Sequence, residues 1–101
     1  MVKLNPDLGE IPNYKAFVMA GNDMLPTINE GDHLVVDINQ RFIRSGDIYA
    51  VNYKESIIVC RLLLDMDKIK LIFDGASHEF NEFVSAITIL GRVIEIKNLN
   101  E

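Results

Sequence analysis

Short runs of apolar and β-branched residues, separated by turn signals, make up most of the chain. Polar and apolar positions alternate at residues 68–73, which read Lys-Ile-Lys-Leu-Ile-Phe, and again at residues 88–97. A two-residue period is typical of a strand with one buried face. Turn signals such as Ser45-Gly46 stand directly before further runs. The sequence therefore predicts strands over residues 15–20, 33–38, 47–53, 56–64, 68–73 and 88–97.

Helical signals are poor, and this decides the expected fold class. Residues 22–30 have room for one short turn around Pro26, and residues 39–44 are expected to form a loop. Gly91 interrupts the alternation of the last run, and a glycine inside a strand predicts a bulge or a bend. No repeat or low-complexity tract divides the chain. We therefore expect a mainly β protein, a single compact domain of short coiled sheets.

The first part of the chain differs from the rest. Residues 1–15 contain Pro6, Gly9 and Pro12 and show little periodicity. We interpret them as an extended N-terminal arm, or as the remnant of a linker from something upstream. Residues 16–101 are then the folded domain, and a chain of 101 residues supports one domain of this kind.

Composition and charge exclude several classes of function. Ten Lys and Arg residues against fifteen Asp and Glu give a net charge of −5, with no basic stripe. Contact with DNA therefore requires a separate DNA-binding domain or a partner. The N-terminus lacks an apolar signal core, and no apolar run approaches the ~20 residues of a membrane span. We expect a cytoplasmic protein without membrane contact.

A single cysteine limits the chemistry further. Cys60 has no second cysteine with which to form a disulfide or a multi-cysteine zinc site. His33 and His78 are isolated, and no motif indicates a cofactor, so we expect neither a metal nor a cofactor. By the two-residue period of its strand, Cys60 shares a face with Ile58 and Leu62. This pattern favours core packing for the thiol over chemistry.

One segment of the chain resembles a known active-site motif. It reads Gly21-Asn22-Asp23-Met24-Leu25-Pro26-Thr27, followed by Gly31-Asp32 and an apolar strand. This resembles the Gly-x-Ser-Met-x-Pro-Thr motif of the LexA-type Ser–Lys peptidases, whose relatives include phage repressors and UmuD. Further stretches match in the same order, namely Ser45-Gly46-Asp47, Val59-Cys60-Arg61-Leu62, residues 71–80 and Gly91-Arg92-Val93. The resemblance covers residues 16–96 and implies a LexA-like or signal-peptidase-like fold.

The same resemblance implies that both catalytic positions are replaced. Asp23 stands where the family has its serine nucleophile, and Cys60 stands where the family has its lysine base. A Ser–Lys dyad needs a hydroxyl and an amine that burial keeps neutral. A carboxylate opposes a developing oxyanion, and a nearby carboxylate raises the pKa of a thiol. We therefore predict no catalytic residue, although the fold has the option of bringing His33 or His78 near Cys60.

Other roles follow from the resemblance. Gly21, Met24, Leu25 and Pro26 are expected to line the former cleft, and Asp23 to cap the turn through its own side-chain oxygen. The family's usual self-cleavage site, Ala-Gly upstream of the motif, is missing from residues 1–15. In the family this domain forms homodimers, which place paired DNA-binding heads on a two-fold operator. The candidate residues for a dimer contact are Leu71, Phe73, Val93, Ile94 and Ile96.

These observations favour an inactive LexA-like domain that serves as a dimerisation and regulatory module of a repressor-type transcriptional regulator. One alternative is a UmuD-like accessory protein of the SOS response that binds a polymerase or a recombinase. Another is an atypical self-cleaving peptidase that uses Cys60 or Asp23. Deliberate replacement of the dyad to trap a structure is a further explanation, but aspartate and cysteine are odd choices where alanine is the usual change.

Overall fold

The computed structural model describes residues 2–4, 13–76 and 79–98, and its architecture is mainly β, as predicted. One antiparallel sheet has the strand order β1-β2-β3-β8-β4-β5-β6-β7. Among the described residues, one 3-10 turn, η2 (Val84–Ala86), precedes the last strand, and there is no α-helix. The strands are β1 (Val2–Leu4), β2 (Tyr14–Met19), β3 (His33–Asp37), β4 (Ile48–Tyr53), β5 (Ser56–Asp65), β6 (Lys68–Ile72), β7 (Glu79–Phe83) and β8 (Ile87–Lys97).

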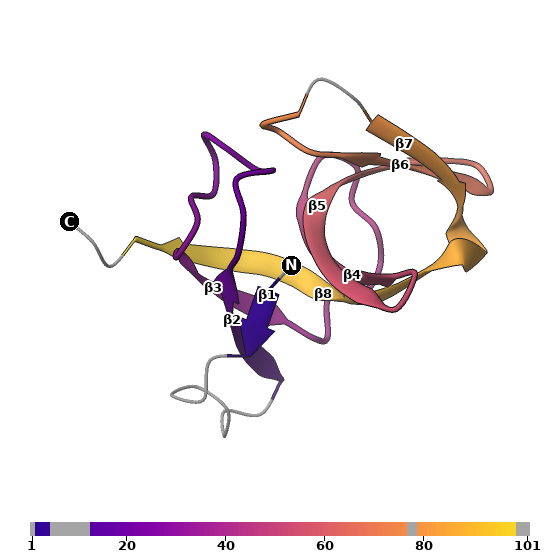
Figure 1. Ribbon diagram of the computed structural model, residues 1–101. Helices are drawn as coiled ribbons and strands as arrows, with labels where there is room; N and C mark the ends of the chain where they lie inside the picture. The colour runs from indigo at the N-terminus through magenta and orange to yellow at the C-terminus, as the bar shows by residue number, and fades with distance from the viewer. Residues whose placement is uncertain (1, 5–12, 77–78, 99–101) are drawn as a thin grey trace.

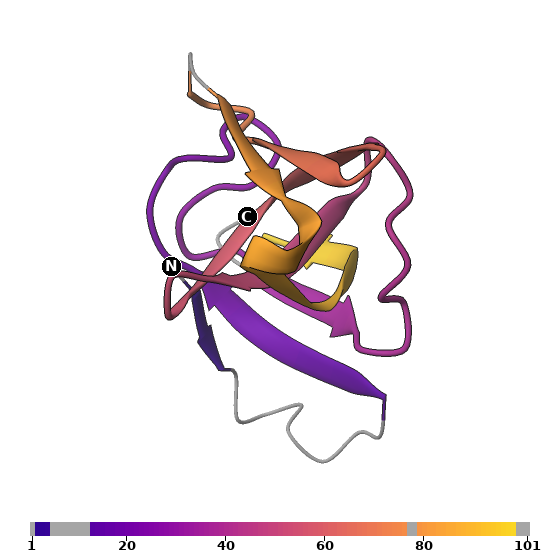
Figure 2. The ribbon, with the colours of Figure 1, turned by 90° about the vertical axis from the view of Figure 1, so that its right-hand side faces the viewer.

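The long strand β8 joins two differently curved parts of the sheet. Its first half pairs with β4, from Tyr53↔Ile87 to Tyr49↔Arg92. Its second half pairs with β3, from Asp37↔Arg92 to His33↔Lys97. Figure 1 shows β4 to β7 curling with the first half of β8 into a ring-shaped end, while β2 and β3 lie beside the second half. In the turned view of Figure 2, β1 and β2 lie below the curled end.

Two register shifts bend β8, and they explain its glycine. Gly91 lies opposite Ala50 and Ile89 opposite Val51, so Leu90 is the extra residue of a bulge against β4. Closer to the C-terminus a second shift leaves Ile94 without an opposite residue on β3. An added Cβ at position 91 would lie 2.4 Å from the Asp37 carbonyl oxygen. The bulge predicted around Gly91 is therefore confirmed, and the lack of a side chain at Gly91 permits β3 to approach this closely.

The core consists of two apolar clusters, one on each side of β5. The first cluster lies under the turn between β2 and β3 and contains Met24, Ile28 and Val59. The second lies inside the curled end and contains Tyr49, Cys60, Leu62, Ile69 and Leu71. Alternate residues of β5 thus enter different clusters, as a two-residue period requires.

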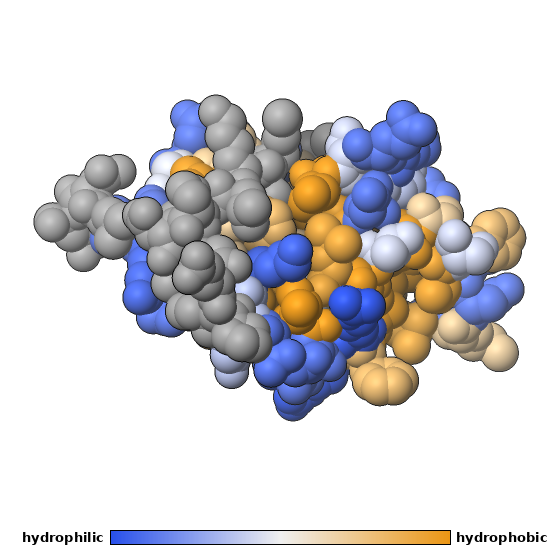
Figure 3. All heavy atoms as spheres, turned by 90° about the horizontal axis from the view of Figure 1, so that it is seen from below, coloured by the Kyte–Doolittle hydropathy of each residue, from blue (hydrophilic) through white to orange (hydrophobic). Residues whose placement is uncertain are grey.

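Apolar side chains also remain on the surface. In the view from below, hydrophobic atoms gather in the middle of the described face and hydrophilic side chains surround them (Figure 3). Over the whole described structure, the large exposed apolar residues are Tyr14, Phe42, Leu64, Met66, Phe80, Phe83, Ile94 and Ile96. Single exposed apolar residues are ordinary, so position and environment decide which of them matter.

The predicted strands agree with β2, β3, β4, β5, β6 and β8 to within one residue at either end. The sequence patterns did not predict β1 or β7. Strand β7 reads Glu-Phe-Asn-Glu-Phe at the sheet edge and is mostly exposed, so no apolar face marks it.

Val2–Leu4, within the predicted arm, pairs with β2 opposite Phe17 to Met19. The division at residue 15 stays a prediction, and residues 5–12 lie outside the described part of the chain.

Candidate functional site

Residues 21–32, between β2 and β3, form the turn that carries the motif. Gly21 has a φ of 90°, a left-handed conformation that favours glycine, and its N–H donates to Glu30 Oε2 at 3.0 Å. Inside the turn, the Ile28 N–H donates to the Met24 carbonyl at 2.9 Å. Met24 and Ile28 are fully buried in the first cluster. These two apolar anchors hold the turn against the sheet. Between them Leu25 and Thr27 are half-buried, and Pro26 is exposed.

The segment after β6, which contains Asp74 and Gly75, packs against this turn. The Gly75 N–H donates to the Asp23 carbonyl at 2.8 Å, and the Asp74 N–H points to the Met24 sulfur at 3.4 Å. An added Cβ on Gly75 would lie 2.8 Å from the Asn22 carbonyl oxygen and 3.0 Å from the Leu25 nitrogen. Glycine at position 75 is therefore needed for the close approach of the two segments.

Asp23, which the motif resemblance aligns with the family nucleophile, is exposed on this turn. Its carboxylate makes no hydrogen bond to any other residue that the structure describes. The prediction that the Asp23 side chain caps the turn is therefore wrong within the described structure. The main-chain carbonyl of Asp23 provides the link instead, by accepting from Gly75.

Cys60, which the motif resemblance aligns with the family base, lies inside the second cluster. It is fully buried and packs with Tyr49, Leu62 and Leu71, and no histidine belongs to this cluster in the described chain. Burial raises the pKa of the Cys60 thiol to about 12. The thiol is therefore protonated at neutral pH and has the properties of a small apolar side chain. The predicted packing role of Cys60 agrees with this burial. His78 lies outside the described residues.

The polar contact to the turn comes from the residue next to Cys60. Arg61 Nε donates to Asp74 Oδ1 at 2.8 Å, and its Nη1 donates to the Gly46 carbonyl at 2.7 Å. Thr27 donates its hydroxyl to the other oxygen of Asp74. The chain Thr27–Asp74–Arg61 thus ties the turn, the segment after β6 and strand β5 together. Sequence reasoning missed this network, although a single arginine inside the apolar run 57–64 was a visible signal.

Electrostatics stabilise the charged form of Asp74. Partial burial acts to raise the pKa of Asp74, but the hydrogen bonds from Arg61 and Thr27, together with the Arg61 charge, outweigh it. The pKa of Asp74 is therefore lower than its ordinary value. Its side chain is 14% exposed and that of Arg61 is 34% exposed, so water screens the pair only in part.

The four residues predicted to line a cleft all lie in the turn, but they differ in exposure. Gly21 and Leu25 are half-buried and Pro26 is exposed, with a cis peptide bond between Leu25 and Pro26. Met24 is fully buried, which corrects the prediction for this residue. Its side chain belongs to the core because the first cluster encloses it.

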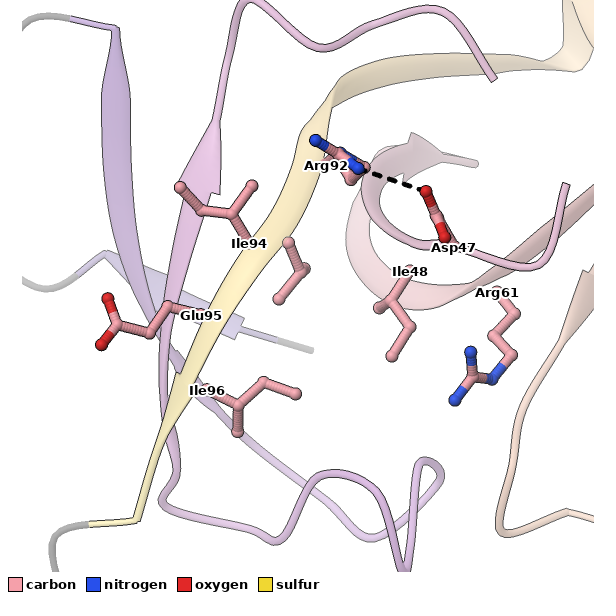
Figure 4. Close-up of a pocket in the computed structure, with 8 residues that line it drawn as sticks. Asp47, Ile48, Arg61, Arg92, Ile94, Glu95 and Ile96 are labelled. Carbon is pink, nitrogen blue, oxygen red and sulfur yellow. Dashed lines mark hydrogen bonds and ion pairs between the residues drawn. The ribbon is translucent and has the colours of Figure 1, made fainter. Parts of the chain in front are cut away.

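A groove runs along the second half of β8, where β4 has already separated from it. Its volume is about 350 Å³, and Arg92 Nη1 crosses it to Asp47 Oδ2 at 3.3 Å (Figure 4). Ile48 and Arg61 face the strand from the other side in the same view. Residues 93–97 pair with β3 on one edge only, so their other edge has no strand partner in the described structure. The groove is lined by Asp47, Ile48, Arg61, Arg92, Val93, Ile94, Glu95 and Ile96.

Three of the five candidate dimer residues lie in this groove. Ile94 is 45% exposed and Ile96 is 36% exposed, while Val93 is half-buried against the first cluster. Phe73 is half-buried and its ring meets Phe80 edge to face, with centroids 6.0 Å apart. The prediction of a dimer contact is wrong for the fifth candidate, Leu71. Its side chain is fully buried in the second cluster and has no surface to offer a partner.

Neither a metal site nor a membrane-spanning helix is present among the described residues. No three His, Cys, Asp or Glu side chains in this part of the chain gather closely enough to hold a metal ion. In the same residues, no helix has the length and apolar character that a bilayer crossing requires.

A curled antiparallel sheet with the motif turn held against β5 defines a LexA-like peptidase-fold domain. Residues 2–94 match the Peptidase S24-like family, and the chain belongs to that family. Over 90 residues the chain is 36% identical to an uncharacterized HTH-type transcriptional regulator of Haemophilus influenzae. That match covers 83% of this chain but 37% of the relative, so the chain spans little more than a third of the relative's length.

Proposed function

We propose that this domain is the regulatory module of a transcriptional regulator, that it lacks peptidase activity, and that it acts by pairing with a second copy of itself. Membership of the Peptidase S24-like family supports a repressor-type role. The relative from Haemophilus influenzae, named as an HTH-type transcriptional regulator, supports the same role. In this proposal a separate domain or partner contacts DNA, because the chain has a net charge of −5.

The absence of peptidase activity is supported chiefly by the surroundings of Cys60. Its thiol is enclosed in the second cluster, whereas the turn that carries Asp23 packs on the first. A nucleophile and its base must lie within hydrogen-bond reach of each other and of a substrate carbonyl. The protonated thiol of Cys60 on one side of β5 and the exposed carboxylate of Asp23 on the other side do not meet this requirement. The same observation weighs against the self-cleaving alternative.

Peptidase activity can be tested directly on the purified chain. Wild type, Cys60→Ala and Asp23→Ala are incubated in parallel at about pH 9, where an accessible thiol would be largely ionised. Intact mass is followed over several days. We expect all three proteins to keep their full mass. Cleavage of the wild type that either substitution abolishes would overturn the proposal and identify the responsible residue.

Self-association is supported by the groove along β8. Ile94 and Ile96 are exposed beside a strand edge that lacks a described partner, and the bulge directs Ile94 out of the regular pairing with β3. Apolar side chains at the centre and charged side chains such as Asp47 and Glu95 around them resemble the core and rim of a protein interface. A two-fold dimer would use this surface twice.

Light scattering during size-exclusion chromatography measures the oligomeric state. At tens of micromolar we expect about 23 kDa for the wild type, twice the chain mass of 11.5 kDa. Ile94→Asp is expected to give a monomer. Leu64→Asp is the matched control, because Leu64 is also 45% exposed but lies outside the groove, and it is expected to remain dimeric. A monomeric wild type, or equal effects of the two substitutions, would contradict the proposed dimer.

The accessory-protein alternative uses the same fold and differs in its partner. A pull-down with the wild-type domain from DNA-damaged cells, compared with Ile94→Asp, separates the two roles. Enrichment of a polymerase or a recombinase by the wild type alone would replace transcriptional regulation as the proposed role.

A further inference from the structure

Another pocket lies beside β2, and it shares no lining residue with the motif turn or with the groove beside Ile94. Its walls come from β2, the segment after β3, the start of β5 and the first half of β8. Its volume of about 390 Å³ falls within the range of small-molecule sites. The described residues that line it are Lys15, Phe17, Ile38, Arg41, Ile57 and Leu90.

The apolar wall of this pocket depends on the first bulge of β8. Leu90 is the residue that the bulge leaves without an opposite residue on β4. Leu90 and Ile57 are half-buried and pack against the first cluster, to which the buried Phe17 belongs. Bulges of this kind often redirect a side chain next to a functional site. Three apolar side chains from three strands therefore converge on one hollow.

The charge at the pocket differs from that of the rest of the molecule. Lys15 and Arg41 are both exposed, and neither forms an ion pair with another described residue. Arg41 Nε donates to the Ile38 carbonyl at 2.8 Å, which holds the guanidinium at the pocket. No carboxylate belongs to the described lining. By contrast, three other pockets of the described structure each include at least one Asp, and the chain as a whole is acidic.

We propose that this pocket binds a small apolar carboxylate. Its hydrocarbon part lies against Phe17, Ile57 and Leu90, and its carboxylate lies between Lys15 and Arg41. A guanidinium and an ammonium are the donors that proteins use for such anions, and the apolar wall excludes water from the rest of the ligand. The volume suits a molecule of this size better than a protein segment. The proposal is independent of the dimer and of the loss of peptidase activity.

Octanoate is the probe, and 1-octanol is its neutral counterpart of equal chain length. Both are titrated into isotopically labelled protein at low salt while backbone amide shifts are recorded. We expect saturable binding of octanoate at submillimolar concentration, with the largest shifts at Phe17, Ile57 and Leu90. Octanol is expected to bind at least about tenfold more weakly, because it leaves both cations unpaired.

Charge-reversal variants give the specificity of the site. Lys15→Glu and Arg41→Glu are each expected to weaken octanoate binding by at least about tenfold. Lys54→Glu, an equal charge change on the exposed β4–β5 turn, is expected to leave it unchanged. Retention of the wild-type amide spectrum outside the pocket shows that each variant is folded. Equal binding of octanol, shifts centred on the groove beside Ile94, or an unchanged affinity of Lys15→Glu would overturn the proposal.

Discussion

On one face of β5, Cys60 and Leu62 are sealed among apolar side chains, whereas on the other face Arg61 reaches the motif turn through Asp74. Cys60 and Arg61 are neighbours in the chain, yet their environments differ. The buried thiol of Cys60 stays protonated, whereas the carboxylate of Asp74 beside Arg61 stays ionised. Burial without a partner favours the neutral form, and burial with a charged donor favours the charged form. The face that contacts the turn therefore holds an ion pair, and the face that carries Cys60 packs into the second cluster.

The largest expected effect comes from placing a charge on the closed face. Cys60→Lys is expected to lower the free energy of unfolding by roughly 4 kcal/mol, because a buried ammonium must lose its charge and its bulk must be accommodated. Cys60→Ala, which only removes a sulfur, is expected to cost about 1 to 2 kcal/mol. Urea unfolding measures both. A lysine variant as stable as the alanine variant would mean that the second cluster is open to water.

A smaller loss is expected when the ion pair of the other face is broken. Asp74→Ala leaves the Arg61 guanidinium and the Thr27 hydroxyl without their shared acceptor, and we expect a loss of about 2 kcal/mol. Lys70→Ala removes a more exposed ion pair, with Glu79, and is expected to cost below about 1 kcal/mol. Urea unfolding of the two variants gives the comparison. Equal losses would contradict a special role for Asp74.

The same carboxylate predicts a dependence on acid. The pKa of Asp74 is lower in the folded protein than its ordinary value in the unfolded chain. Its contribution is therefore complete above the unfolded value and is lost as the pH falls through the folded value. Between pH 7 and pH 2, stability is expected to fall more steeply for the wild type than for Asp74→Asn, which cannot titrate there. If thermal unfolding gave the same pH dependence for both proteins, Asp74 would contribute nothing to the acid dependence of stability.

The smallest effect is expected at Asp23 in the motif turn. Asp23→Ala changes an exposed carboxylate that bonds no other described residue, while the main-chain bond from Gly75 to position 23 is kept. We expect a change of at most about 0.5 kcal/mol in the free energy of unfolding. Gly75→Ala is the contrasting variant, since its Cβ meets the turn backbone and should destabilise the protein measurably. A large effect of Asp23→Ala would mean that its side chain holds the turn.

Much of the site was visible in the sequence, but its contacts were not. The motif around Asp23 located the turn, and the two-residue period placed Cys60 with Leu62 on one face. The same reasoning put Leu71 on a dimer surface and Met24 in a cleft, and both are buried. Local patterns mark a side chain as apolar, but they do not distinguish an apolar core from an apolar contact surface.

By itself the sequence determined three things about this protein. It is a mainly β domain of the LexA type, six of its strands lie where the apolar patterns predict them, and β8 has a bulge next to Gly91. Alternation and glycine are local properties, so they are readable without knowing what each strand packs against. Only the tertiary structure decided that Arg61 rather than Cys60 contacts the turn, and that the bulges direct Leu90 and Ile94 into separate hollows. A two-residue period states that neighbours point apart, but which side each one meets depends on the curl and register of the whole sheet.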